Sequence, residues 1–170
     1  MKALFVFLSL FFTFYIEVLF SSFFILFPLS FASFFYLSVY LKWSTSLFLL
    51  PLVASVHESL IPGHSFLVFL LIYPAALFWR HKGDCSQLFM QVVPIFLSSI
   101  LLLPLYLLLN NAAYFLNGHL LEFFFHFVIA LTLVTLSYFP LISIFHYFTK
   151  RFEIPLYTEL QREDKHHAKH

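Results

Sequence analysis

The chain has 170 residues, of which 62% are apolar and 10% charged, against about 45–50% and about 25% in soluble domains. This composition excludes a water-soluble globule, and it excludes a disordered chain, which needs low hydrophobicity and high charge. A net charge of +1 argues against nucleic-acid binding. The remaining class is an all-α integral membrane protein. Because a span needs roughly 20 apolar residues, the chain has room for about six transmembrane helices.

The first apolar stretch runs from residue 3 to residue 41 and is interrupted by a single charge, Glu17. This stretch is too long for one span and suits two, with a turn between about Glu17 and Pro28. Lys42 closes the second span. We expect Glu17 to end the first span at the outer membrane surface, because the residues before it nearly suffice to cross the bilayer.

Apolar runs at 46–56 and 65–79 mark the third and fourth expected spans, which share the chain between Lys42 and Arg80. Between them lie His57, Glu58 and a Pro62–Gly63 turn signal, in which Pro sets φ and Gly permits a positive φ.

A fifth apolar run follows at 88–109, and a sixth at 120–149. We therefore predict a six-span transmembrane domain at 1–149 and a polar cytoplasmic tail at 150–170. The lone Cys lies between the fourth and fifth runs and suggests no disulfide.

The basic residues test this division, because cytoplasmic loops carry the Lys and Arg of membrane proteins. Six spans place every basic residue of the chain on the side of the two termini, which is therefore predicted to be cytoplasmic. These residues are Lys2, Lys42, Arg80, Lys82, Lys150, Arg151, Arg162, Lys165 and Lys169. Topology accounts for most of their role, and those flanking spans also suit anionic lipid headgroups.

Ionisable residues on the opposite side are the candidates for a site, because charges at membrane depth are costly. They are Glu17, His57, Glu58, His64, His119, Glu122 and His126. If their segment is helical, His119, Glu122 and His126 share one face and could together bind a divalent metal. The alternative is that they are ordinary polar residues at the membrane interface. Neither a tight metal motif nor a complete nucleophile–base set is present, so we predict no metal, no cofactor and no catalytic residue.

The segment 47–73 resembles the central part of the bacterial rod-shape-determining MreD family. In that family a span ends in an acidic residue, and a turn with Pro and Gly leads into a second span closed by basic residues. Glu58 stands where the family usually has Asp, and Pro62–Gly63 matches the turn approximately.

This resemblance implies a non-enzymatic scaffold of the cell-elongation machinery in the bacterial cytoplasmic (inner) membrane. The implied partner is a single-pass protein resembling MreC, and through it actin-like MreB and the peptidoglycan synthases. The implied fold is similar to the substrate-binding subunits (S-components) of energy-coupling-factor transporters. The residues expected to bind the partner are Glu17, His57, Glu58, Pro62, Gly63, His64, His119, Glu122 and His126.

The alternative function is a small-solute-binding subunit of such a transporter, with its site among the same residues. An S-component should carry small residues on its first helix for docking. The first run of this chain is rich in Phe and Leu instead, which favours the scaffold. An intramembrane enzyme is a third hypothesis, disfavoured because no catalytic motif is complete.

Overall fold

A computed structural model describes residues 2–21, 29–60, 65–82, 120–152 and 154, together with isolated positions between 93 and 109. These residues are helical almost throughout, and no strand occurs among them. The helices are α1 (Lys2–Ser21), α2 (Leu29–Tyr40), α3 (Trp43–Leu60), α4 (Ser65–Lys82) and α7 (Leu120–Arg151). The expected fifth span lies largely outside the described residues.

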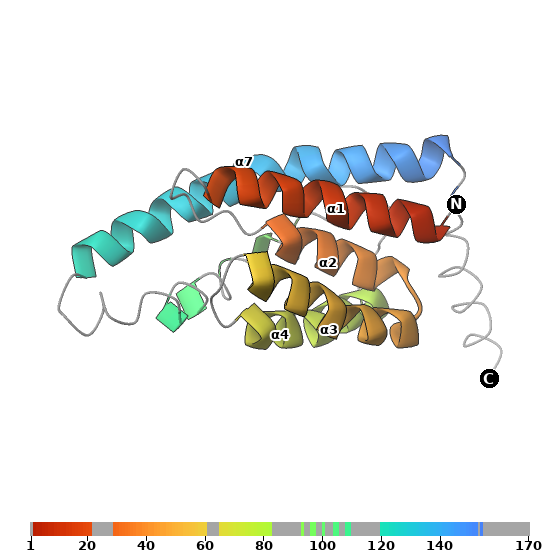
Figure 1. Cartoon of the computed structure of the whole chain (residues 1–170), viewed down its shortest axis with the longest axis horizontal. Helices are drawn as coiled ribbons and strands as arrows, with labels where there is room; N and C mark the ends of the chain where they lie inside the picture. The colour runs from red at the N-terminus through yellow and green to blue at the C-terminus, as the bar shows by residue number, and fades with distance from the viewer. Residues whose placement is uncertain are drawn as a thin grey trace.

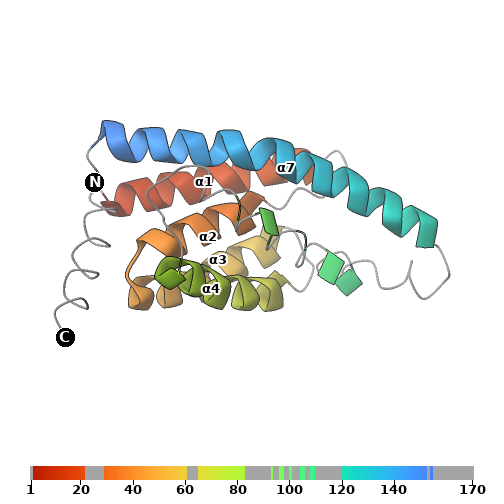
Figure 2. The ribbon, with the colours of Figure 1, turned by 180° about the vertical axis from the view of Figure 1, so that it is seen from behind.

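The helices lie side by side as a bundle in which the chain alternates in direction from α1 to α4 (Figure 1). The view from behind shows the same arrangement, with α7 alongside α1 and running opposite to it (Figure 2). At its N-terminal end, α7 projects beyond the other helices in both views. The bundle therefore has two ends, and helix termini of consecutive elements meet at each.

Helix α2 is the centre of the bundle. All twelve of its residues are buried, and it contacts α1, α3, α4 and α7. Edge-to-face aromatic packing joins it to α4, with ring centroids of Phe31 and Phe34 at 5.0 and 5.5 Å from that of Phe69. A helix that is buried on every side is stable only where other helices surround it.

The break between α2 and α3 comes at Leu41 and Lys42, as the charge at Lys42 predicts. Arg80 Nη1 donates to the carbonyl of Leu41 at 2.6 Å, which satisfies an acceptor just beyond the last turn of α2. The Tyr73 hydroxyl donates to the carbonyl of Trp43, the first residue of α3, at 3.1 Å. Both bonds come from α4 and join the same end of the bundle.

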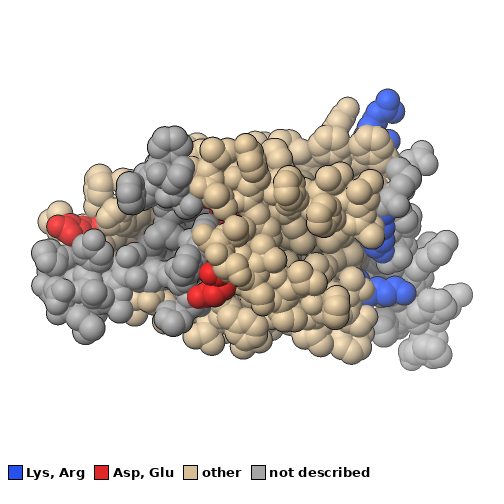
Figure 3. Space-filling view, in the orientation of Figure 1, with Lys and Arg blue, Asp and Glu red and all other residues tan. Residues whose placement is uncertain are grey.

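The described Lys and Arg residues lie at one end of the bundle, and the described Glu residues lie toward the other (Figure 3). The basic end carries Lys2 at the start of α1, Lys42 after α2, Arg80 near the end of α4, and Lys150 and Arg151 at the end of α7. The basic residues named here therefore share one end of the bundle.

The flanks of the bundle expose many large apolar side chains. Phe7, Phe11, Phe48 and Leu121 are each more than half exposed, which is unusual for the surface of a soluble monomer. Two described helices, α1 and α7, are long and apolar enough to cross a membrane.

Candidate functional site

The acidic end of the bundle contains a buried contact between α1 and α2. Glu17, one turn before the end of α1, directs its Oε1 at Ser30, the second residue of α2. Ser30 donates its backbone N–H to that oxygen at 3.2 Å and its hydroxyl at 3.0 Å. The first N–H groups of a helix lack intrahelical acceptors, and a carboxylate also suits the positive end of the helix dipole. We call this pair the inner clasp.

The expectation that Glu17 ends its span at the surface is wrong. Helix α1 continues to Ser21, and Glu17 is only 1% exposed. Burying a carboxylate is costly unless other groups replace its water, and here the two donors of Ser30 do so for Oε1, whereas Oε2 is buried without a hydrogen-bond partner among the described residues.

A third helix reaches the inner clasp through His57 of α3. Its Nε2 lies 3.7 Å from Glu17 Oε1, close enough for an ion pair and longer than a hydrogen bond. The imidazole is 1% exposed, and its ring centroid lies 5.7 Å from that of Phe31 and 5.6 Å from that of Phe69. The sequence singled out Glu17 and His57 separately, and the fold brings them together.

One turn away, a second polar contact joins α1 to α2. The hydroxyls of Thr13 and Ser33 lie 2.8 Å apart, and Thr13 also donates to the carbonyl of Ser9 at 2.6 Å. Our sequence analysis missed these residues. The signal that reveals them is the interval of four between Ser9, Thr13 and Glu17, which places all three on one face of an otherwise apolar helix.

A similar clasp joins α3 to α4 nearer the surface. Glu58, two residues before the end of α3, accepts through Oε2 from the backbone N–H of Ser65 at 3.0 Å and from its hydroxyl at 2.8 Å. Ser65 is the first residue of α4, so Glu58 caps that helix from across the turn. We call this pair the outer clasp.

Beside the outer clasp is a shallow depression of about 330 Å³, lined by Ala54, Ser55, Glu58, Ser59 and Phe66. Glu58 is partly exposed there. The depression places a carboxylate at the surface near the turn on which the family resemblance rests.

Four of the other predicted site residues lie outside the described residues, namely Pro62, Gly63, His64 and His119. Glu122 and His126 are exposed on the first turns of α7, in the part that projects beyond the other helices (Figure 1).

The described residues contain no group of three or more His, Cys, Asp or Glu side chains that could hold a metal ion. Within the described part of the chain, the acidic end therefore holds two Glu–Ser pairs, with His57 against the inner one. These hydrogen bonds join helices to one another, because each Glu carboxylate accepts from a Ser of the next helix in the chain.

No protein-family model, no curated protein and no solved structure matches the chain.

Proposed function

We propose that the chain is a multi-pass protein of the bacterial cytoplasmic membrane, with about six spans and both termini in the cytoplasm. Two observations support this. The described basic residues lie at one end of the bundle, as the positive-inside rule requires. The exposed Phe and Leu side chains on the flanks suit contact with lipid.

Within that membrane, we propose a non-enzymatic scaffold of the MreD kind, which binds a single-pass partner resembling MreC. The observation that carries this proposal is the closed polar interior. Glu17, Ser30 and His57 are each at most 1% exposed, and Glu17 of α1 lies against Ser30 of α2 and His57 of α3. They stiffen the bundle, and its apolar outer faces remain available to a partner's helix.

The same observation disfavours the solute-binding alternative. A polar solute needs side chains that point into a cavity, whereas these point at one another. A second hollow, of about 620 Å³, lies elsewhere, between α1 and α7, and its lining is almost entirely apolar. On this proposal, the outer clasp holds the turn between α3 and α4 so that the outer surface keeps one shape.

Affinity purification after cross-linking in membranes tests the scaffold. We expect the tagged chain to retain a single-pass cell-wall protein, identified by mass spectrometry. Glu58→Ala should reduce that yield several-fold, because the turn at the outer surface loses its clasp. Ser59→Ala is the control on the same turn of α3, because the Ser59 hydroxyl donates to the carbonyl of Ser55 in its own helix, and this change should leave the yield unchanged. Recovery of a vitamin or of an ATPase module would contradict the scaffold.

The membrane topology has its own test. A reporter fused after Lys169 should be cytoplasmic, and one inserted at Asn111 should face the other side. Both reporters on the same side would contradict the six-span division.

A further inference from the structure

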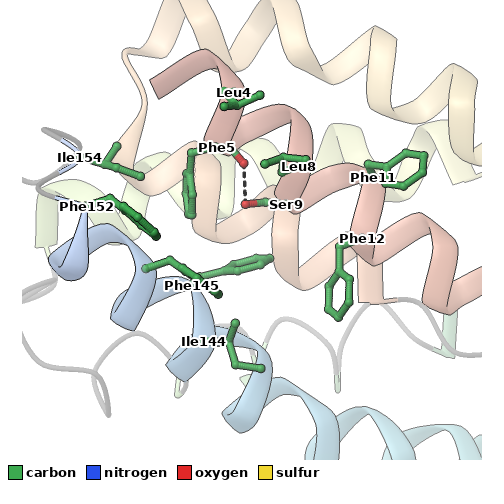
Figure 4. Close-up of a pocket in the computed structure, with 11 residues that line it drawn as sticks. Leu4, Phe5, Leu8, Ser9, Phe11, Phe12, Ile144, Phe145, Phe152 and Ile154 are labelled. Carbon is green, nitrogen blue, oxygen red and sulfur yellow. Dashed lines mark hydrogen bonds between the residues drawn. The ribbon is translucent and has the colours of Figure 1, made fainter. Parts of the chain in front are cut away.

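A groove of about 620 Å³ lies between α1 and α7 near the basic end of the bundle (Figure 4). Its walls are apolar side chains, among them Leu4, Leu8 and Phe12 of α1 and Phe145 and Phe148 of α7. Ser9 also lines it, but the Ser9 hydroxyl donates to the carbonyl of Phe5 at 2.7 Å. The groove therefore suits a hydrocarbon occupant.

The length of the groove matches one leaflet of a bilayer. Its lining runs from Leu4 to Phe12 on α1, and from Ile144 on α7 to Phe152 and Ile154 just beyond the end of that helix. Eight steps of 1.5 Å give about 12 Å along α1, close to the depth of the hydrocarbon core of one leaflet, about 15 Å. A partner's transmembrane helix would need a seat about twice as long. An acyl chain that enters from one leaflet needs no more than this.

The charged residues near the groove indicate which headgroup such a lipid would carry. Lys2 lies two residues before Leu4, and the exposed Lys150 and Arg151 directly precede Phe152. These cations lie at the end of the bundle near which the groove lies, the level at which the headgroup of a lipid in the groove would lie. Basic residues at the cytoplasmic surface attract anionic lipids.

We propose that this groove binds one acyl chain of an anionic phospholipid, whose headgroup phosphate contacts Lys150 and Arg151. The proposal rests on the membrane location proposed above and does not depend on the scaffold function. It gives the basic pair at the end of α7 a ligand in addition to its part in topology.

The test counts lipids that remain on the purified protein in native mass spectrometry, after incubation with equal amounts of phosphatidylglycerol and phosphatidylcholine that have the same acyl chains. We expect the unmodified chain to retain phosphatidylglycerol preferentially. Neutralising Lys150 and Arg151 to Gln should lower this preference about fivefold for each charge. Lys42→Gln is the matched control, since Lys42 is exposed at the same end of the bundle but lies away from the groove lining.

A second variant fills the groove. Leu8→Trp should reduce retained phosphatidylglycerol about tenfold, because the indole occupies the space of several methylene groups. Its control is Leu52→Trp on α3, since Leu8 and Leu52 are 51% and 52% exposed. Circular dichroism of each variant should show unchanged helix content.

The proposal is overturned if Leu8→Trp and Leu52→Trp retain equal amounts of lipid, or if Lys42→Gln lowers the preference as much as the changes at 150 and 151. It is also overturned if a photo-cross-linker at Leu8 captures a protein in place of lipid. Failure of the scaffold would look different, because partner capture would be lost while lipid selectivity persisted. The membrane location is tested before either of these experiments, by washing membranes with alkaline carbonate. Release of the chain by this wash would contradict that location.

Discussion

The inner and outer clasps use the same bonds in two different surroundings. In each, a Glu near the end of one helix accepts the backbone N–H and the hydroxyl of a Ser at the start of the next helix. The inner carboxylate is buried and has His57 against it, whereas Glu58 is partly exposed at a surface depression.

The difference shows how the surroundings set the role of a helix cap. At the surface, water competes for the carboxylate, so losing the cap costs about what an ordinary N-cap costs. In the interior, nothing replaces the lost acceptor, so the donors of Ser30 and the imidazole of His57 are left in an apolar core. One pair mainly shapes a turn, and the other holds three helices together.

The largest expected effect comes from Glu17→Ala. It should lower the free energy of unfolding by about 3 kcal/mol, because breaking a buried pair strands its partners. The measurement is unfolding by sodium dodecyl sulfate in mixed micelles, followed by circular dichroism. A loss no greater than that of Glu58→Ala would remove the distinction between the clasps.

Double-mutant cycles compare the interaction energies of the two Glu–Ser pairs directly. We expect a coupling energy of about 1.5 kcal/mol between Glu17→Ala and Ser30→Ala, and about 0.5 kcal/mol between Glu58→Ala and Ser65→Ala. Both cycles use the same denaturant titration. Equal couplings would show that burial does not strengthen the inner clasp.

Glu58→Ala alone should cost about 1 kcal/mol, as loss of an N-cap usually does. The same unfolding titration measures it. Ser59→Ala is the control on the same turn of α3, because the Ser59 hydroxyl bonds only within its own helix, to the carbonyl of Ser55, among the described residues. A Glu58 variant as stable as this control would contradict the outer clasp.

The smallest effect concerns salt. Glu58→Gln should cost roughly 0.5 kcal/mol at low ionic strength, and 1 M salt should reduce this difference, because exposed charges at helix ends are screened. The difference between the chain and its Glu17→Gln variant should not change with salt, since water does not reach that carboxylate. Equal salt dependence at the two positions would contradict the burial of Glu17.

The sequence predicted the positions where the chain turns better than it predicted which faces meet. Lys42 marks the start of α3, Pro62 and Gly63 separate α3 from α4, and the described basic residues lie at one end. These signals are local, because charges and turn formers interrupt apolar runs wherever they occur.

The inner clasp could not be predicted from such local signals in the sequence. Helix α1 is apolar around most of its circumference, so the usual contrast between a polar outer face and an apolar inner face is missing. Its rotation follows from packing against α2, and that packing turns Glu17 inward. Only the intervals from Ser9 to Thr13 to Glu17 point to that face, and they gain meaning once Ser30 and Ser33 lie opposite.

The complete burial of α2 has a consequence for how the protein is made. All twelve of its residues are buried among the neighbouring helices. In a membrane, α2 cannot leave the translocon as a separate segment, because it has no surface of its own for lipid. Glu17 likewise has no donors until Ser30 has been synthesised. We therefore expect α1 to be held beside the translocon until α2 emerges, so that the two helices enter the lipid together as a hairpin.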